Sequence, residues 1–213
     1  MAEEHVSVPR GRHAPPLEVR RGVQRQRLFE AAARVFSQMG YADASAEAIS
    51  REAGMSKATF YEHFANKEEC ILSLVDAAAG ATRHAVTEAA ADGDEVVDAK
   101  IHARVHAFLE IVAAFPEFAR VVIVDVIGVG PVGAAKRDEM LEAFGAFLDA
   151  ENESAHERYG APRFASPDDA YAIVGAIMEL ASRQLRTGHP ADPRDLEPVI
   201  ERVVAGVIAQ GTP

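Results

Sequence analysis

The chain has 213 residues, a formal net charge of −11 at pH 7, 48% hydrophobic residues and 26% charged residues. This length suits a small domain joined to a larger one, and the composition is typical of a globular protein. The net charge argues against a protein that coats nucleic acid over its whole surface. No apolar run approaches the roughly 20 residues that cross a bilayer, and no N-terminal segment resembles a secretory signal. We therefore expect a cytoplasmic protein without membrane contact.

The distribution of charge and cysteine narrows the function classes. Residues 1–67 hold ten Lys and Arg against eight Asp and Glu, so the acidic excess lies in the rest of the chain. Any contact with DNA should therefore belong to the N-terminal third. Cys70 is the single cysteine, which excludes an internal disulfide and a thiolate metal cluster. It lies in an apolar helical stretch, where we expect a buried, unreactive thiol.

Residues 1–19 contain three prolines among scattered charges and show no apolar period, so we interpret them as a flexible basic arm. Four arginines at or near this arm are candidates for contact with a phosphate backbone: Arg10, Arg12, Arg20 and Arg21.

Three short helices are predicted between residues 25 and 64. In the first, apolar residues recur at steps of three and four up to Gly40. Ser45 is a suitable N-cap for the second helix, and Ser56 for the third. Gly54 lies between them and permits a left-handed backbone. Two short helices joined by a Gly-Met-Ser turn are typical of a helix-turn-helix.

In a helix-turn-helix, the N-terminal part of the last helix enters the major groove, where base edges distinguish all four base pairs. Lys57 and Thr59 are the candidates for contact with bases. Ser45, Tyr61 and Lys67 offer hydroxyls, a helix N-terminus and an ammonium for contact with phosphates.

The motifs of this segment are Ala-x-x-x-Phe at 32–36, Gly-Tyr at 40–41, Ile49, the run from Ala53 to Phe64 and Asn-Lys-Glu at 66–68. Over about 45 residues the chain thereby resembles the tetracycline-repressor (TetR) family of transcriptional regulators. The resemblance implies an all-helical dimer whose larger domain binds a small effector. It also implies backbone contacts with DNA for Ser45, Tyr61 and Lys67, and it places four residues toward the groove: Lys57, Ala58, Thr59 and His63.

Glu62 departs from what a DNA-facing helix favours, because a carboxylate there repels phosphate unless it accepts a hydrogen bond from cytosine N4. Its role stays open at this point.

We predict an all-α fold of about nine helices. Residues 20–67 form the helix-turn-helix domain, and residues 68–213 form a larger helical domain for effector binding and dimerisation. Asn66 and Glu69 make a capping-box pattern at the start of the fourth helix. Beyond it, the punctuation by Gly and Pro predicts five more helices, at roughly 95–114, 117–127, 132–158, 167–187 and 194–210.

One rival pattern suggests a nucleotide-dependent enzyme. The apolar run 121–127 precedes Gly128-x-Gly130-x-x-Gly133, which matches a strand that leads into a dinucleotide-binding loop. That fold needs a second strand about 20 residues later, ending in an acidic residue. Residues 143–149 have helical spacing instead, so we favour a helix-helix loop. We expect neither an enzyme nor a cofactor.

His102 and His106 stand four apart, the spacing that puts two imidazoles on one helix face for a metal. Ala103 occupies the position where a zincin carries its catalytic Glu. A third ligand would have to come from a distant carboxylate such as Glu110 or Asp125. We favour polar groups of an effector pocket, or surface histidines, over a metal site.

Bulky residues in the larger domain are candidates to line a cavity for an apolar or aromatic effector, although core packing explains the same pattern. With the two histidines, the predicted pocket residues are Phe108, Phe115, Phe118, Met140, Phe144, Phe147, Tyr171 and Met178.

The last two predicted helices are apolar on more than one face, which suggests that they form the interface of a homodimer. Two-fold symmetry would then set two recognition helices on successive major grooves of a near-palindromic operator. The sequence favours a repressor of this kind, with affinity for DNA controlled by a small molecule. The alternatives are the nucleotide-dependent enzyme and a DNA-binding protein without a ligand.

Overall fold

The structure is a computed structural model that describes residues 16–90 and 97–211, and these form helices and no β-strand. The long and short helices follow one another along the chain with brief connections. They are α1 (Leu17–Asp43), α2 (Ala46–Glu52), α3 (Lys57–His63), α4 (Lys67–Glu88), α5 (Val97–Ala114), α6 (Pro116–Ile123), α7 (Pro131–Tyr159), α8 (Pro167–Thr187) and α9 (Glu197–Ile208), with two short 3-10 helices, η1 (Asp125–Val129) and η2 (Pro193–Leu196). The all-α prediction is confirmed.

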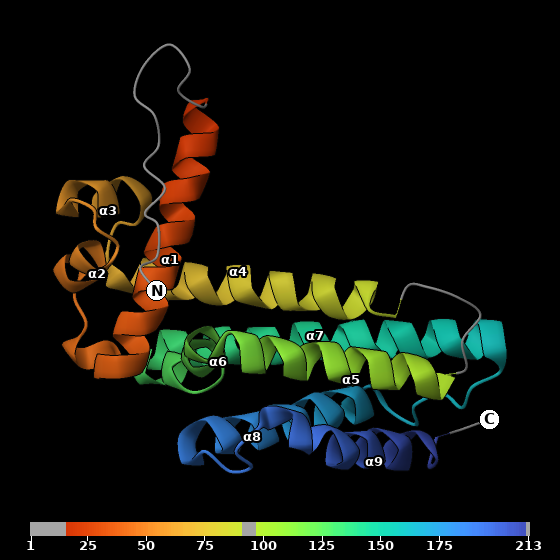
Figure 1. Cartoon of the computed structure of the whole chain (residues 1–213). Helices are drawn as coiled ribbons and strands as arrows, with labels where there is room; N and C mark the ends of the chain where they lie inside the picture. Colours follow the sequence, from red (N-terminus) through yellow and green to blue (C-terminus); the bar gives the residue numbers. More distant parts are fainter. Residues whose placement is uncertain (1–15, 91–96, 212–213) are drawn as a thin grey trace.

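Figure 1 shows how these helices divide the molecule. The head consists of α1, α2 and α3, with α1 upright beside the two short helices. In the body, α4, α5 and α7 run alongside one another, and α8 and α9 lie beneath them. The fourth helix belongs to both parts, because it starts at the head and then lies along the body.

The first helix starts earlier than its apolar period predicts. It begins at Leu17, so the last residues of the predicted arm 1–19 are helical. The early turns carry no buried apolar residue, and the first one is Leu28, which is why the pattern did not reveal them. Arg10 and Arg12 lie outside the described residues. Gly40 has a φ of 76° and bends the chain before the last residues of α1, so Gly40 marks a kink rather than the end.

An aromatic cluster holds the head together. Phe36, Phe60 and Phe64 are almost completely buried. The ring centroid of Phe64 lies 5.5 Å from that of Phe29 on α1 and 5.4 Å from that of Phe60 on α3. Such tilted pairs stabilise a small core beyond the area that they bury. The three helices of the head are therefore fixed to one another by packing across α1.

The head is not a separate globule, because its core continues into the body. The same cluster of buried side chains includes Phe36 and Phe60 in the head and Val121, Val126 and Met178 in the body. The contacts pass from α1 to α6 and η1. A second cluster, with Leu109, Ile173 and Ile200, joins α5, α8 and α9. Because α6 is close-packed against α1, a shift of α6 therefore displaces α1.

The alternative interpretation of residues 121–133 as a strand and a dinucleotide-binding loop is wrong, and the helix-helix loop favoured from the sequence is confirmed. Residues 116–123 form helix α6, and Gly128 lies within η1 rather than after a strand. Gly130 has a φ of 96° and serves as the N-cap of α7. Gly133 packs so closely that a Cβ there would lie 2.0 Å from the carbonyl oxygen of Val126. Gly130 and Gly133 are thus required by a tight connection between η1 and α7, whereas Gly128 has open space around it.

Cys70 is buried at the start of α4, as expected. Burial raises the pKa of its thiol to about 12, so the reactive thiolate is scarce at neutral pH. Within the part of the chain that is described, none of the helices combines the length and apolar character needed to span a bilayer.

Candidate DNA-binding surface and effector cavity

The helix-turn-helix forms as its N-caps predict. The Ser45 hydroxyl accepts a hydrogen bond from the amide of Ala48 (3.1 Å), and the Ser56 hydroxyl accepts one from the amide of Thr59 (3.1 Å). Gly54 has a φ of 65°, which lets the chain reverse between α2 and α3. The two helices are therefore set by local chemistry at the turn.

The predicted base-contacting residues do not all face the same way. Lys57 and Ala58 are exposed on the first turn of α3, and Tyr61 is half exposed. Thr59 is partly buried, and its hydroxyl lies 2.9 Å from that of Ser56. His63 turns back toward α1, where its Nε2 lies 3.4 Å from Oε1 of Gln24. The free surface of α3 is thus formed chiefly by four exposed residues: Lys57, Ala58, Tyr61 and Glu62.

Burial lowers the pKa of His63, and the nearby positive charges of Arg25 and Arg21 lower it further. The imidazole is therefore neutral at physiological pH and adds no charge to the surface of the head.

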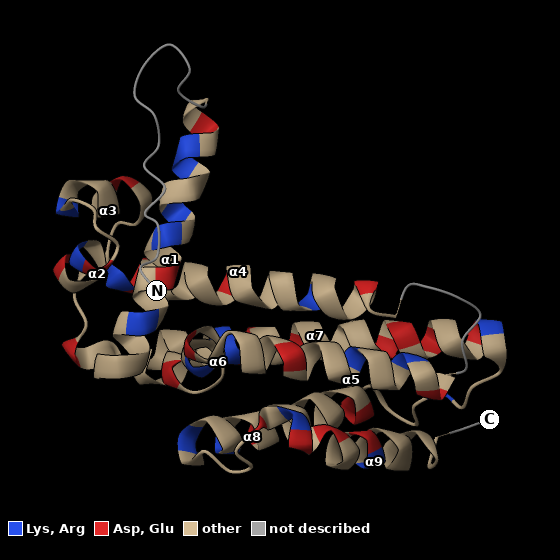
Figure 2. Ribbon diagram, in the orientation of Figure 1, with Lys and Arg blue, Asp and Glu red and all other residues tan. Residues whose placement is uncertain are grey.

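Arginines gather on the N-terminal half of α1, where Figure 2 shows a run of basic positions beside α3. Arg20 and Arg21 are exposed, as contact with phosphates requires. Arg25 lies over the ring of Phe64, 4.9 Å from its centroid, and Arg27 donates to the carbonyl of Ala53 (3.2 Å). The sequence analysis missed Arg25 and Arg27, because the partner of each, the ring of Phe64 and the carbonyl of Ala53, lies far along the chain.

Lys67 has a different role from the one predicted. Its ammonium donates to the carbonyl oxygens of Tyr41 (2.7 Å), Ala42 (3.0 Å) and Ala44 (2.9 Å). An ammonium has three N–H groups, so all of them have partners inside the head. The kink at Gly40 leaves these carbonyls without partners in a helix, and the cation supplies them. We therefore correct Lys67 from a phosphate contact to a clamp between α4 and the end of α1.

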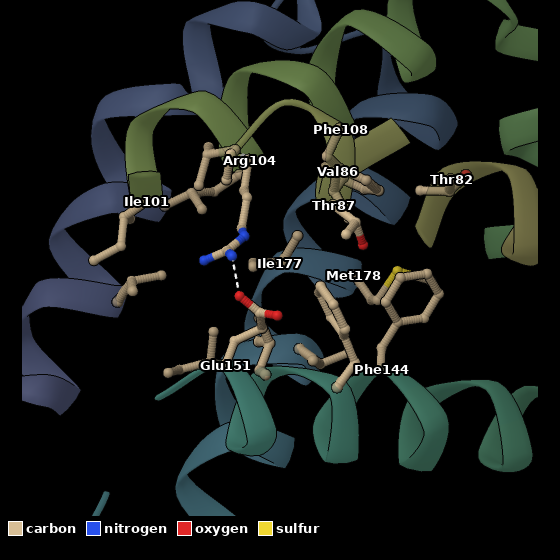
Figure 3. Close-up of a pocket in the computed structure, with 18 of the residues that line it drawn as sticks. Thr82, Val86, Thr87, Ile101, Arg104, Phe108, Phe144, Glu151, Ile177 and Met178 are labelled. Atoms are coloured by element: carbon tan, nitrogen blue, oxygen red, sulfur yellow. Dashed lines mark hydrogen bonds and ion pairs between the residues drawn. The ribbon is translucent and has the colours of Figure 1, made fainter. Parts of the chain in front are cut away.

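The body contains an apolar cavity of about 380 Å³, a volume within the range of small-molecule sites, roughly 300–1,000 Å³. Helices α4, α5, α6, α7, α8 and α9 all contribute to its lining. Figure 3 shows Phe144 and Met178 on one side of the space and Arg104 facing Glu151 across it.

Most of the predicted pocket residues line this cavity. Those in the lining are Phe108, Phe115, Phe118, Met140, Phe144, Phe147 and Met178. Tyr171 lies instead in a shallow groove between α7 and α8. His102 and His106 are exposed and are not part of the lining, so their predicted place in the pocket is wrong. Their contacts with α9 are described below.

Sequence analysis missed the charged pair in the cavity. Arg104 of α5 and Glu151 of α7 form a hydrogen-bonded ion pair, and both side chains are mostly buried. The Nε of Arg104 has no hydrogen-bond partner among the described residues. Arg104 falls on the apolar stripe that Ile101, Val105 and Phe108 form, which was a usable signal. Glu151 gave none, because several other acidic residues surround it in α7.

The cavity and the head share two helices. Ala119, Val122 and Ile123 of α6 line the cavity, while α6 also packs against α1. Likewise, Thr82 and Val86 of α4 line it, and Lys67 at the other end of α4 holds the end of α1. A molecule in the cavity thus touches both helices that connect it with the head.

Comparisons with known proteins agree with this architecture. Residues 28–74 match the family described as bacterial regulatory proteins, tetR family. No protein of curated function matches the sequence significantly.

Three solved structures illustrate the likeness in fold. The fatty acid degradation regulator FadR from Bacillus halodurans is 20% identical with a TM-score of 0.78, over 86% of this chain and 95% of that one. FadR from Bacillus subtilis, solved with stearoyl-CoA, is 18% identical with a TM-score of 0.74, over 85% of this chain and 98% of that one. A TetR-like regulator from Rhodococcus sp. RHA1 is 21% identical with a TM-score of 0.64, over 89% of this chain and 97% of that one.

The clamp predicts that Lys67→Met destabilises the protein. Three carbonyls lose their donor, those of Tyr41 and Ala44 in part-buried hydrogen bonds and that of Ala42 in an exposed one. Hydrogen bonds to charged groups contribute ~1.5–3 kcal/mol each. We expect the free energy of unfolding in urea to fall by about 2–4 kcal/mol, a part of that sum because water reaches some of the carbonyls. Lys57→Met is the matched control, since Lys57 is exposed, and should change it by less than about 0.5 kcal/mol. Equal stability of the two variants would contradict the clamp.

Proposed function

We propose that the chain is a DNA-binding transcriptional regulator of the tetR family, and that it is a repressor whose affinity for its operator changes when a small molecule occupies the cavity. The observation that carries the proposal is the shared use of α4 and α6, which touch both the cavity and the head. The protein would act in the cytoplasm, where bacterial DNA lies.

The proposed effector is amphipathic, with an apolar chain and an anionic group. The aliphatic and aromatic lining suits the chain, and Arg104 suits the anion. Lys100 and Arg158 also line the cavity and add positive charge. A fatty acyl thioester has these properties, and stearoyl-CoA is present in the structurally similar FadR from Bacillus subtilis. The sequence predicts an apolar or aromatic effector, and this proposal adds an anionic group at one end of it.

Control of DNA binding requires that the effector prefers one pose of the head over another. The apolar chain of an effector that enters between α4, α6 and α7 contacts Val86, Val122 and Met140. Dense packing transmits displacement, so a shift of α6 moves α1. The head would then present α3 at a different position relative to its copy in a dimer.

For the dimer we propose an interface through α8 and α9, as the sequence analysis predicts. The two apolar stripes of α8 do not form this interface, because they pack inside the chain: Val174 and Met178 in one core, Ile173 and Ile177 around the other. The support is the remaining outer face of α8. It exposes Tyr171 and Ala172 beside the small residues Gly175 and Ala176, which allow a close approach of helices.

In the dimer, each α3 would enter a major groove, with Lys57 and Ala58 nearest the base edges. Ser45 and Tyr61 are exposed at positions suited to phosphate contacts, and Arg20 and Arg21 extend the same basic surface. Thr59 and His63 would contribute less, since the hydroxyl of Thr59 lies 2.9 Å from that of Ser56 and the imidazole of His63 faces α1.

The division between base and phosphate contacts is tested with two single-charge variants, Lys57→Ala and Arg21→Ala. After selection of bound sequences from random DNA, Lys57→Ala should relax the preference at one operator position, at a cost of about 1–3 kcal/mol for the preferred base. Arg21→Ala should weaken binding to all sequences alike and reduce the salt slope by about 1. If both variants weaken every sequence equally, Lys57 does not contact a base.

The effector is tested by titrating the complex of protein and selected operator with stearoyl-CoA. The wild type should release DNA. The variant with Arg104→Leu and Glu151→Leu keeps the cavity neutral and filled. It should retain operator affinity but need about 10- to 100-fold more ligand, because a charge-assisted hydrogen bond contributes ~1.5–3 kcal/mol.

The control for this titration removes an exposed ion pair of the same kind, with Arg163→Ala and Glu153→Ala. It should respond as the wild type does. Operator binding that no concentration of stearoyl-CoA alters in the wild type would reject the acyl thioester. An unchanged response of the leucine variant would exclude Arg104 from contact with the anion.

A further inference from the structure

Two histidines and two glutamates meet between α5 and α9, on a face of α5 that does not line the cavity. His102 and His106 lie one turn apart on α5, and Glu197 and Glu201 lie one turn apart on α9. The sequence spacing of the histidines is that of a pair of metal ligands, with a distant carboxylate such as Glu110 or Asp125 as the third. Neither Glu110 nor Asp125 is that ligand, because Glu110 is bound by Arg194 and Asp125 pairs with Arg120.

The carboxylate of Glu197 connects the two imidazoles. Its Oε1 lies 3.4 Å from Nδ1 of His102 and 3.4 Å from Nδ1 of His106. The Oε1 of Glu201 lies 2.7 Å from Nδ1 of His102. His102, Glu197 and Glu201 each offer a ligand atom within 4.8 Å of the others. Three potential ligand atoms thus surround one small space between the helices, and His106 lies beside it through its contact with Glu197.

The two distances between Oε1 of Glu197 and the imidazole nitrogens suit ligands of a shared metal ion better than hydrogen bonds. Zinc bonds to His nitrogen and carboxylate oxygen are about 2.0–2.2 Å long, so ligand atoms at a tetrahedral site lie about 3.3–3.5 Å apart. The two distances of 3.4 Å at Glu197 match that value. Glu201 lies closer to His102 than that value, and its half-exposed side chain is free to move outward. Within this group the close contact of His106 is with Glu197.

The environment of Glu197 provides a second, independent indication. Its Oε1 is inaccessible to solvent and has no hydrogen-bond partner among the described residues. A buried carboxylate oxygen without a donor is costly, and a cation would remove that cost. The two glutamates carry two negative charges, which a divalent ion neutralises when the imidazoles are neutral ligands.

We propose that His102, Glu197 and Glu201 form a site for one divalent transition-metal ion of the zinc class, with His106, next to Glu197, as the fourth ligand once the ion is bound. Imidazole with carboxylate is a donor set that suits zinc, and a surface position leaves the ion an entry path. The ion would fix α5 to α9. Because Ile101, Arg104 and Val105 of α5 line the cavity, it would also stiffen one wall of that cavity.

The site is tested on the tag-free protein with Co²⁺ as a spectroscopic probe and Zn²⁺ as its competitor. One equivalent of Co²⁺ per chain should give the intense visible absorption of a tetrahedral ion, and Zn²⁺ should displace it. His102→Ala and Glu197→Gln should each weaken binding by about 100-fold or more, since even outer partners of metal ligands contribute 10- to 100-fold. His84→Ala, which removes an exposed histidine from α4, should bind as the wild type does.

A stability measurement covers the case in which a variant is poorly folded. Zn²⁺ should raise the melting temperature of the wild type and of His84→Ala, and should leave that of Glu197→Gln unchanged. Absence of one-per-chain Co²⁺ binding in the wild type would overturn the proposal. Equal affinity in the wild type and in both ligand variants would overturn it as well.

Discussion

The function that we propose depends on one physical constraint, namely that helix α6 is packed on both sides. On one side it presses on α1 through a core that runs from Phe36 and Phe60 in the head to Val121 and Val126. On the other side, Val122 and Ile123 face the cavity. A helix that is close-packed on one side and faces a ligand on the other cannot absorb a displacement locally. The cavity and the DNA-binding surface are therefore mechanically connected.

Helix α4 supplies the second connection and explains why Lys67 is a structural residue. Its ammonium holds the three carbonyls that the kink at Gly40 exposes, so the start of α4 and the end of α1 move together. Thr82 and Val86, further along the same helix, touch the cavity. The sequence offered a lysine next to a helix start, a position equally suited to phosphate. Only the course of the chain after Gly40 decides between the two roles.

Much of the fold follows from local chemistry and was predictable. The N-caps at Ser45 and Ser56 marked the starts of α2 and α3. The Gly and Pro residues between helices placed α8 at its observed bounds and the other body helices within a few residues. The start of α1 was missed because its early turns bury no apolar residue. The glycines near residue 130 imitated a nucleotide-binding loop, since a tight turn and a close approach require Gly in either fold.

The sites were less predictable, because they depend on which helices meet. Aromatic and Met residues of α5, α6 and α7 do surround a cavity, yet its ion pair joins Arg104 to a glutamate 47 positions later. The same holds for His102 and its partner Glu201, 99 positions apart. A helical period shows which residues share a face, but it does not show the facing helix. Charged pairs between distant helices therefore emerge only from the fold.

The most direct test of the connection between cavity and head is the distance between the two heads of a dimer. Glu47→Cys places a reactive thiol on exposed α2, while the raised pKa of Cys70, about 12, and its burial keep that thiol unlabelled. With a nitroxide at residue 47, pulsed electron resonance should report a dimer whose label separation changes by at least about 2 Å when stearoyl-CoA binds. A separation that stays the same while the ligand demonstrably occupies the cavity would contradict the account.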